Sequence, residues 1–143
     1  MTRRDRISQG RAIFAHLTDD YGIRVSYRKD HATHGAAWFQ DGRGHVIVPP
    51  IRGYVSLATA LHEVGHILLK HPGDTTLPQE LEAWGFARAK MDEAGIPWTP
   101  SVGAHAIACL MTHADATHKA GDGDGRARQI AAALRVLREA ELL

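Results

Sequence analysis

The residues of this sequence with the clearest chemical potential are two histidines and a glutamate in one short run, His62-Glu63-Val64-Gly65-His66. On an α-helix, residues four apart lie about 40° from each other on one face. His62 and His66 can therefore reach the same small cation, and zinc suits a site built from imidazole nitrogens. Glu63 is offset by about 100° from His62. Its carboxylate is poorly placed as a third ligand, but it can reach a metal-bound water and act as general base.

A catalytic zinc site needs a third protein ligand and one open position. The next predicted helix offers two candidates, Glu80 and Glu82. Glu80 shares a helical face with apolar residues, so its carboxylate would be buried and would need a partner such as a metal ion. The residues on that face are Ala83, Trp84, Ala87 and Met91. Glu82 lies nearly opposite, and its helical position alone does not exclude it.

Two runs of the sequence resemble the ImmA/IrrE family of bacterial and phage zinc metallopeptidases. They are His62-Glu63-Val64-Gly65-His66-Ile67-Leu68-Leu69 and Glu80-Leu81-Glu82-Ala83-Trp84-Gly85-Phe86-Ala87. The family has an H-E-[IL]-[GA]-H helix followed by a helix reading E-x-[EQ]-A-[ND]-x-F-A. Trp84 stands where the family has Asn or Asp, and the similarity covers residues 46–89, about a third of the chain.

The resemblance implies a gluzincin-like domain in which His62, His66 and Glu80 hold zinc and Glu63 is the general base. It further implies a protein or peptide substrate that lies along an edge strand. The family context is that of phages and mobile elements, in which a transcriptional repressor is a candidate substrate.

The elements that would position these residues follow the order helix, small sheet, then helices, which implies an α+β domain. Apolar spacing predicts a helix over residues 6–17 and strands over 23–28, 36–40 and 45–48. Turn residues between the last two strands predict a hairpin. Further helices are expected over 56–71, 78–95 and 99–118. We therefore expect a zincin-like domain over 1–120, a flexible linker at 121–125 and an amphipathic helix at 126–143.

A second set of metal-binding residue types lies at helical spacing, namely His105, Cys109 and His113. This face could carry another metal or a group that stabilises an oxyanion. The preferred interpretation is a partly buried helix face. Separately, the sequence places four aromatic residues in the core, which are Trp38, Phe39, Trp84 and Trp98.

Composition narrows the function classes. A formal net charge of +1 across 143 residues argues against nucleic-acid or membrane binding driven by charge. The single cysteine, Cys109, permits no internal disulfide, and no segment resembles a signal peptide or a transmembrane span, so a cytoplasmic protein is expected. The predicted function is zinc-dependent peptide hydrolysis. The alternatives left open are a zinc-stabilised, non-catalytic binding module, which a fourth ligand such as His105 or His113 would favour, and a zinc hydrolase for another bond.

Overall fold

The computed structural model describes residues 1–117 and residue 135. The predicted linker and C-terminal helix therefore lie outside the described residues, apart from residue 135. The described part confirms a small α+β fold with an N-terminal helix, and its helices and strands are α1 (Arg3–Asp20), β1 (Arg24–Tyr27), β2 (Ala36–Gln40), β3 (Arg43–Val48), α2 (Tyr54–Leu68), α3 (Leu77–Glu93) and α4 (Pro100–Thr117). None of these helices is both long and apolar enough to span a bilayer.

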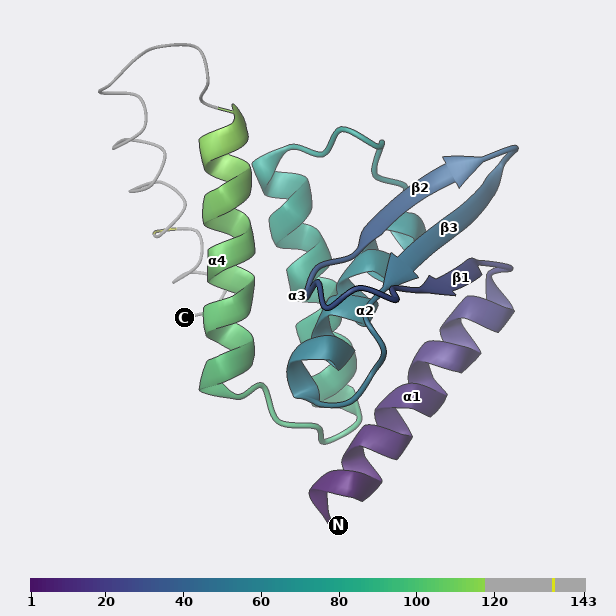
Figure 1. Cartoon of the computed structure of the whole chain (residues 1–143), viewed down its shortest axis with the longest axis vertical. Helices are drawn as coiled ribbons and strands as arrows, with labels where there is room; N and C mark the ends of the chain where they lie inside the picture. Colours follow the sequence, from purple (N-terminus) through teal and green to yellow (C-terminus); the bar gives the residue numbers. More distant parts are fainter. Residues whose placement is uncertain (118–134, 136–143) are drawn as a thin grey trace.

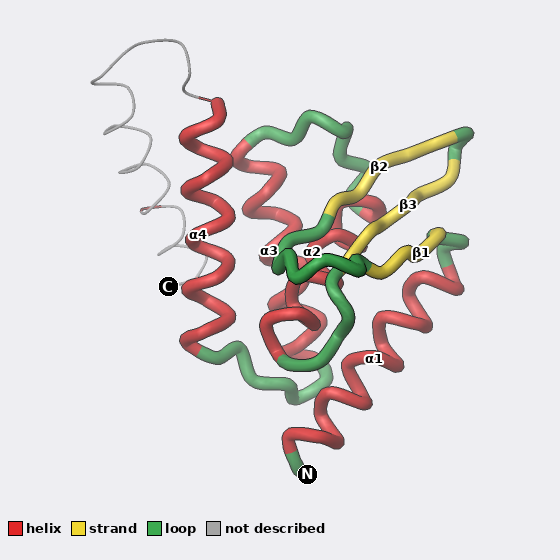
Figure 2. Tube along the Cα trace, viewed as in Figure 1, coloured by secondary structure: helices red, strands yellow, loops and turns green. Residues whose placement is uncertain are grey.

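The three strands form one mixed sheet with the order β1-β3-β2, and α1 runs beside its β1 edge (Figure 2). The predicted hairpin is confirmed, because β2 and β3 pair antiparallel, whereas β1 pairs with β3 in parallel. Asp41 and Gly42 form the tip of the hairpin, and both have positive φ, at 54° and 74°. This is the backbone conformation of a tight hairpin turn. Because β3 lies between them, β1 and β2 are the edge strands of this sheet.

Helix α2 lies at the centre of the domain and contacts α1, α3, α4, β2 and β3. Figure 1 shows α4 on the side of the molecule opposite the β2–β3 hairpin, with α2 and α3 between them. One face of α2 is apolar and packs into the core, since Leu57, Leu61 and Val64 are fully buried. The opposite face, with the two histidines, is buried too. The helix is thus surrounded by protein, rather than lying half in solvent.

The helix boundaries follow from local capping. The first helix is longer than predicted, because Thr2 and Asp5 form a capping box that starts it at Arg3. At the start of α2, the Ser56 hydroxyl accepts hydrogen bonds from the backbone amides of Arg52 and Gly53. Helix α3 begins after Thr76, whose side chain accepts from the Gln79 amide.

Two of the four aromatic residues expected in the core are not there. Trp38 and Phe39 remain 38% and 45% exposed, because β2 is an edge strand whose ends reach solvent. Trp38 stacks instead on His45 of the neighbouring strand. Trp84 is buried as predicted, and Trp98 packs against the core while remaining partly exposed.

Candidate metal centre

Three side chains from α2 and α3 converge on one point. His62 and His66 lie one turn apart on α2, and their Nε2 atoms are 3.1 Å from each other. The Oε2 atom of Glu80, at the start of α3, lies 3.0 Å from His62 Nε2 and 3.1 Å from His66 Nε2. Glu63 Oε1 is 3.5 Å from His62 Nε2. His62, Glu63 and His66 form a group that could hold a metal ion, and Glu80 closes the triangle of donor atoms.

Glu80 is held in this orientation by its other oxygen, which accepts a 2.7 Å hydrogen bond from the Thr75 hydroxyl. Partial burial opposes ionisation of Glu80, but hydrogen bonds from His62 and His66 outweigh it and lower the pKa of Glu80 well below its usual range. Burial lowers the pKa of His62 to about 4, despite the nearby carboxylate. At neutral pH the site therefore presents a neutral His62 imidazole beside an ionised Glu80. That combination offers lone pairs to a cation.

His66 has a second partner that the sequence did not reveal. Its Nδ1 atom lies 2.9 Å from Nδ1 of His71, which is buried. The Nε2 atom of His71 lies 3.5 Å from the Glu82 carboxylate. One set of neutral tautomers satisfies this chain: His66 donates from Nδ1 to His71, and His71 donates from Nε2 toward Glu82. With these tautomers His66 Nε2 carries no proton and can bind a metal ion. Without a metal, the opposite tautomers let His66 Nε2 donate to Glu80.

The structure therefore distinguishes the two candidate third ligands, Glu80 and Glu82. Glu80 lies on the histidine pair, whereas Glu82 lies behind it, on His71. Only His71, five residues after His66 and just beyond the end of α2, links Glu82 to the site. The tertiary fold turns its ring inward, where it is buried.

His62 is oriented differently, by packing against Trp84. The two rings stack with centroids 4.0 Å apart, and Trp84 is almost completely buried. The Nδ1 atom of His62 is buried and has no hydrogen-bond partner among the described residues. A partnerless buried polar atom costs about 1–3 kcal/mol. Stacking on the Trp84 indole, rather than a hydrogen bond, thus positions the His62 ring.

Glu63 lies beside the triangle of donors, with Oε1 3.5 Å from His62 Nε2, and it is buried. Burial, reinforced by the charge of Glu80, raises the pKa of Glu63 to about 7, although His66 opposes the shift. Gly35, just before β2, packs closely against it: a Cβ atom there would be 2.9 Å from Glu63 Cγ and 2.6 Å from the Ile47 carbonyl oxygen. The loop before β2 therefore approaches Glu63 to within contact distance, and only glycine fits.

A pocket of about 620 Å³ opens onto these residues. Its walls come from the loop before β2 and from α2, α3 and α4, and they include His34, Thr59, Glu63, Glu80, Trp84, His105, Cys109 and His113. The sequence-predicted stripe on α4 is partly buried, as expected, and in addition it lines this pocket. The structure thus brings together residues more than 70 positions apart, which the spacing on α4 alone could not show.

Two members of the α4 stripe, His105 and Cys109, contact residues other than the three donors. His105 Nε2 lies 3.3 Å from Thr59 Oγ1 and 3.7 Å from Cys109 Sγ, and its ring contacts Trp84. Within the described residues, no hydrogen bond or ring contact of His105 involves His62, His66 or Glu80. Burial, with the charges of Glu80 and Glu63, raises the pKa of Cys109 to about 11. The thiol therefore stays protonated at neutral pH in the metal-free protein.

The donor set of two imidazoles and one carboxylate fits a divalent cation such as zinc.

No protein-family model, no curated protein and no solved structure matches this chain.

Proposed function

We propose that this protein is a zinc-dependent peptidase of the kind its motifs resemble. The observation that carries the proposal is the triangle of His62 Nε2, His66 Nε2 and Glu80 Oε2, with separations of 3.0–3.1 Å, beside the buried carboxyl of Glu63. Three protein ligands and a pocket on the open side are typical of catalytic rather than structural zinc sites. A closed, non-catalytic site would need a fourth ligand; His105, one of the two candidates on α4, instead lies 3.3 Å from Thr59 Oγ1 through its Nε2 atom.

Zinc bound by His62, His66 and Glu80 would supply Lewis acidity and lower the pKa of a water molecule. Glu63 is the group that moves the proton. A carboxyl whose pKa is about 7 exchanges protons readily near neutral pH. Glu63 would take a proton from the attacking water and pass it to the amine that leaves. Thr75 holds Glu80 and His71 holds His66, so that the donors keep their positions during this transfer.

The loop and strand beside Glu63 favour a peptide as substrate. Thr33, His34 and Gly35 line the pocket and lead directly into β2, which is an edge strand. An extended chain that pairs with such an edge uses backbone hydrogen bonds, which every peptide can supply. Paired with β2 and continued past Gly35, it would carry a scissile bond across the pocket.

The proposal is tested by incubating the zinc-loaded protein with a library of peptides from a bacterial proteome and identifying new termini by mass spectrometry. The Glu63→Gln variant should bind zinc normally and lose at least about 100-fold in rate, since it lacks the general base. Glu93→Gln, the same exchange at an exposed position on α3, should cleave like the wild type.

If the Glu63→Gln variant still cleaved peptides at the wild-type rate, Glu63 would not be the general base. A chelator should abolish cleavage, and zinc should restore it. Metal-dependent hydrolysis of esters, with no cleavage in the peptide library, would contradict the peptide part of the proposal and leave the water-activating site intact.

A further inference from the structure

Four arginines from two distant parts of the chain line one pocket. It has a volume of about 440 Å³ and is formed by Arg3, Arg4, Ile7 and Arg11 of α1 together with Arg52 of the loop before α2. No acidic side chain is among these lining residues. The N-terminal arginines suggest a solvated helix face when read in sequence, but the fold adds Arg52 and makes the face concave.

The arginines of this pocket differ in what holds them. Arg11 Nε donates a 2.9 Å hydrogen bond to the carbonyl oxygen of Ile51, and the guanidinium of Arg3 lies 5.3 Å from the centre of the Tyr54 ring. The side chains of Arg4 and Arg52 make no hydrogen bond or ion pair within the described part of the chain. Two guanidinium groups are thus positioned, and two more are available to an anion.

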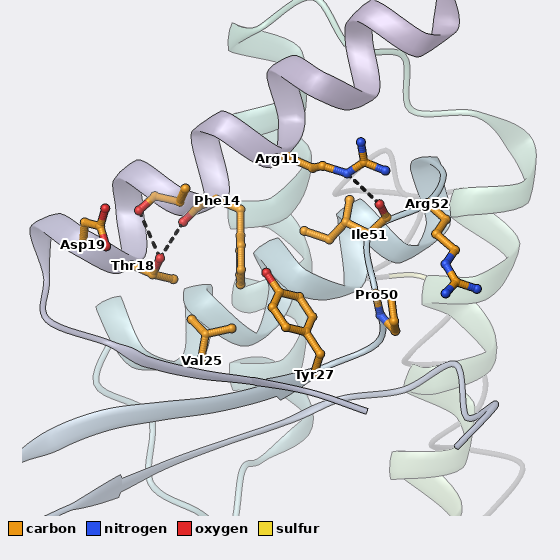
Figure 3. Close-up of a pocket in the computed structure, with 10 residues that line it drawn as sticks. Arg11, Phe14, Thr18, Asp19, Val25, Tyr27, Pro50, Ile51 and Arg52 are labelled. Atoms are coloured by element: carbon orange, nitrogen blue, oxygen red, sulfur yellow. Dashed lines mark hydrogen bonds between the residues drawn. The ribbon is translucent and has the colours of Figure 1, made fainter. Parts of the chain in front are cut away.

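A second, more apolar pocket continues from the first. It has a volume of about 660 Å³, lies between α1 and β1, and shares Arg11 and Arg52 with the arginine pocket. In Figure 3, Val25 and Tyr27 of β1 point toward Phe14 of α1, with the Arg11–Ile51 hydrogen bond at one end of the pocket.

A chain of shared residues connects this region to the metal centre. A third pocket, of about 510 Å³, shares Arg3 with the arginine pocket and Thr33 with the pocket over the metal site. Arg3 and Thr33 thus each line two neighbouring pockets between the arginines and the metal centre.

We propose that this arginine groove, defined as Arg3, Arg4, Arg11, Arg52 and the adjoining surface of Phe14, Val25 and Tyr27, binds an acidic, extended segment of the protein substrate. Guanidinium groups pair with carboxylates in a bidentate way, and the apolar floor accepts alternate side chains of an extended chain. A nucleic acid is the less suitable occupant, because Asp19 also lines the apolar pocket and the chain is almost neutral overall. Assignment of the segment to a substrate rests on the proposed peptidase function, whereas the binding itself does not.

Binding can be measured by fluorescence anisotropy with a labelled twelve-residue peptide of alternating glutamate and valine. The Glu63→Gln protein is used so that the probe stays intact. The double variant Arg4→Glu/Arg52→Glu should bind at least about tenfold more weakly, which corresponds to about 1.4 kcal/mol. Lys29→Glu reverses a charge at an exposed position outside the groove and should stay within twofold of the parent. Tyr27→Ser should also weaken binding severalfold, since Tyr27 supplies part of the apolar floor.

Equal binding by the double variant and the parent would overturn the arginine groove. A peptide with lysine in place of glutamate should not bind, and this arm needs no folded variant. Tighter binding of a twelve-nucleotide single-stranded DNA than of the acidic peptide would also overturn the proposal, because it would identify a nucleic-acid surface. Peptide binding without any peptidase activity would contradict the proposed function and leave the groove standing, whereas activity without binding would do the reverse.

Discussion

At the scale of single residues, the candidate centre depends on how each donor is held. Glu80 is fixed by Thr75, His66 by His71, and His62 by the stacked ring of Trp84. Groups behind the ligands of a metal site set ring orientation and tautomer, and their loss typically lowers affinity 10- to 100-fold. We therefore expect substitution of a ligand to lower metal affinity more than substitution of the residue that holds it in place.

The pair Glu80→Gln and Glu82→Gln tests that grading with the same chemical change two residues apart. Glu80→Gln removes an anionic donor from the histidine pair, so zinc affinity should fall at least about 100-fold. Glu82 acts only through His71 at 3.5 Å and is largely exposed, so its replacement should cost less than about tenfold. Competition titration against a chromogenic chelator measures both. A larger loss for Glu82→Gln than for Glu80→Gln would reverse the assignment.

At the scale of elements, the site requires α2 and α3 to lie unusually close, and Gly65 permits it. A Cβ atom at Gly65 would lie 3.0 Å from Phe86 Cδ1 and 3.2 Å from the Ala83 carbonyl oxygen. Such contacts are tighter than packed side chains normally allow. The glycine between Glu63 and His66 therefore lets the start of α3 deliver Glu80 to the histidines, at a cost in helix propensity.

Gly65→Ala and Gly85→Ala should shift stability in different ways. Alanine at Gly85 of α3 meets no atom within 4 Å, so it should stabilise the helix by about 1 kcal/mol. Alanine at Gly65 gains the same propensity but must push against α3, and overpacking costs about 1–3 kcal/mol. We expect urea unfolding to place Gly65→Ala about 1–3 kcal/mol below Gly85→Ala. Equal stabilities would mean that the two helices can separate freely.

At the scale of the whole molecule, the donors join two helices that are also held by the core, so metal binding should stabilise the fold. Zinc at about a thousand times its dissociation constant adds about 4 kcal/mol to the free energy of unfolding. For a domain of this size, the melting temperature should rise by about 10 °C or more. Differential scanning fluorimetry measures the shift, with magnesium as the control ion, because it prefers oxygen ligands. A comparable shift with magnesium would contradict a site built on imidazoles.

The pH dependence of stability in the metal-free protein should report on Glu63. Its pKa is raised by burial from 4.5 to about 7, so its stabilising contribution is complete below pH 4.5 and is lost as the pH rises through about 7. His62 acts in the opposite sense: burial lowers its pKa from 6.5 to about 4, so its contribution is present above pH 6.5 and is lost as the pH falls through about 4. The two effects oppose each other between pH 4.5 and 6.5 in the wild type.

Glu63→Gln removes only the first of these effects and thereby separates them. The stability of this variant relative to wild type should rise between pH 4.5 and pH 8, by an amount on the order of 3 kcal/mol. Urea unfolding with chelator at pH 4.5, 6 and 8 measures the difference, and Glu93→Gln controls for the exchange itself. A difference that stays constant with pH would show that Glu63 titrates like a solvated carboxyl.

The sequence by itself determined the features that depend on neighbours along the chain. The spacing of His62 and His66 places both rings on one face of α2, and the turn residues specify the β2–β3 hairpin. The shared face of Glu80 and Ala83 is visible in the helical period, and the structure buries Ala83 on that face. These are local relations, which backbone geometry enforces whatever the rest of the fold does.

Only the tertiary structure decided which distant groups meet. Helical position left both Glu80 and Glu82 open, and the packing of α3 on α2 brought Glu80 to the histidines and Glu82 to His71. The exposure of Trp38, the pocket wall supplied by His105 and the addition of Arg52 to the N-terminal arginines were equally hidden. Each depends on how elements pack across the core. That packing is a property of side-chain volumes and close approaches, such as the one at Gly65, and not of any single helical or strand period.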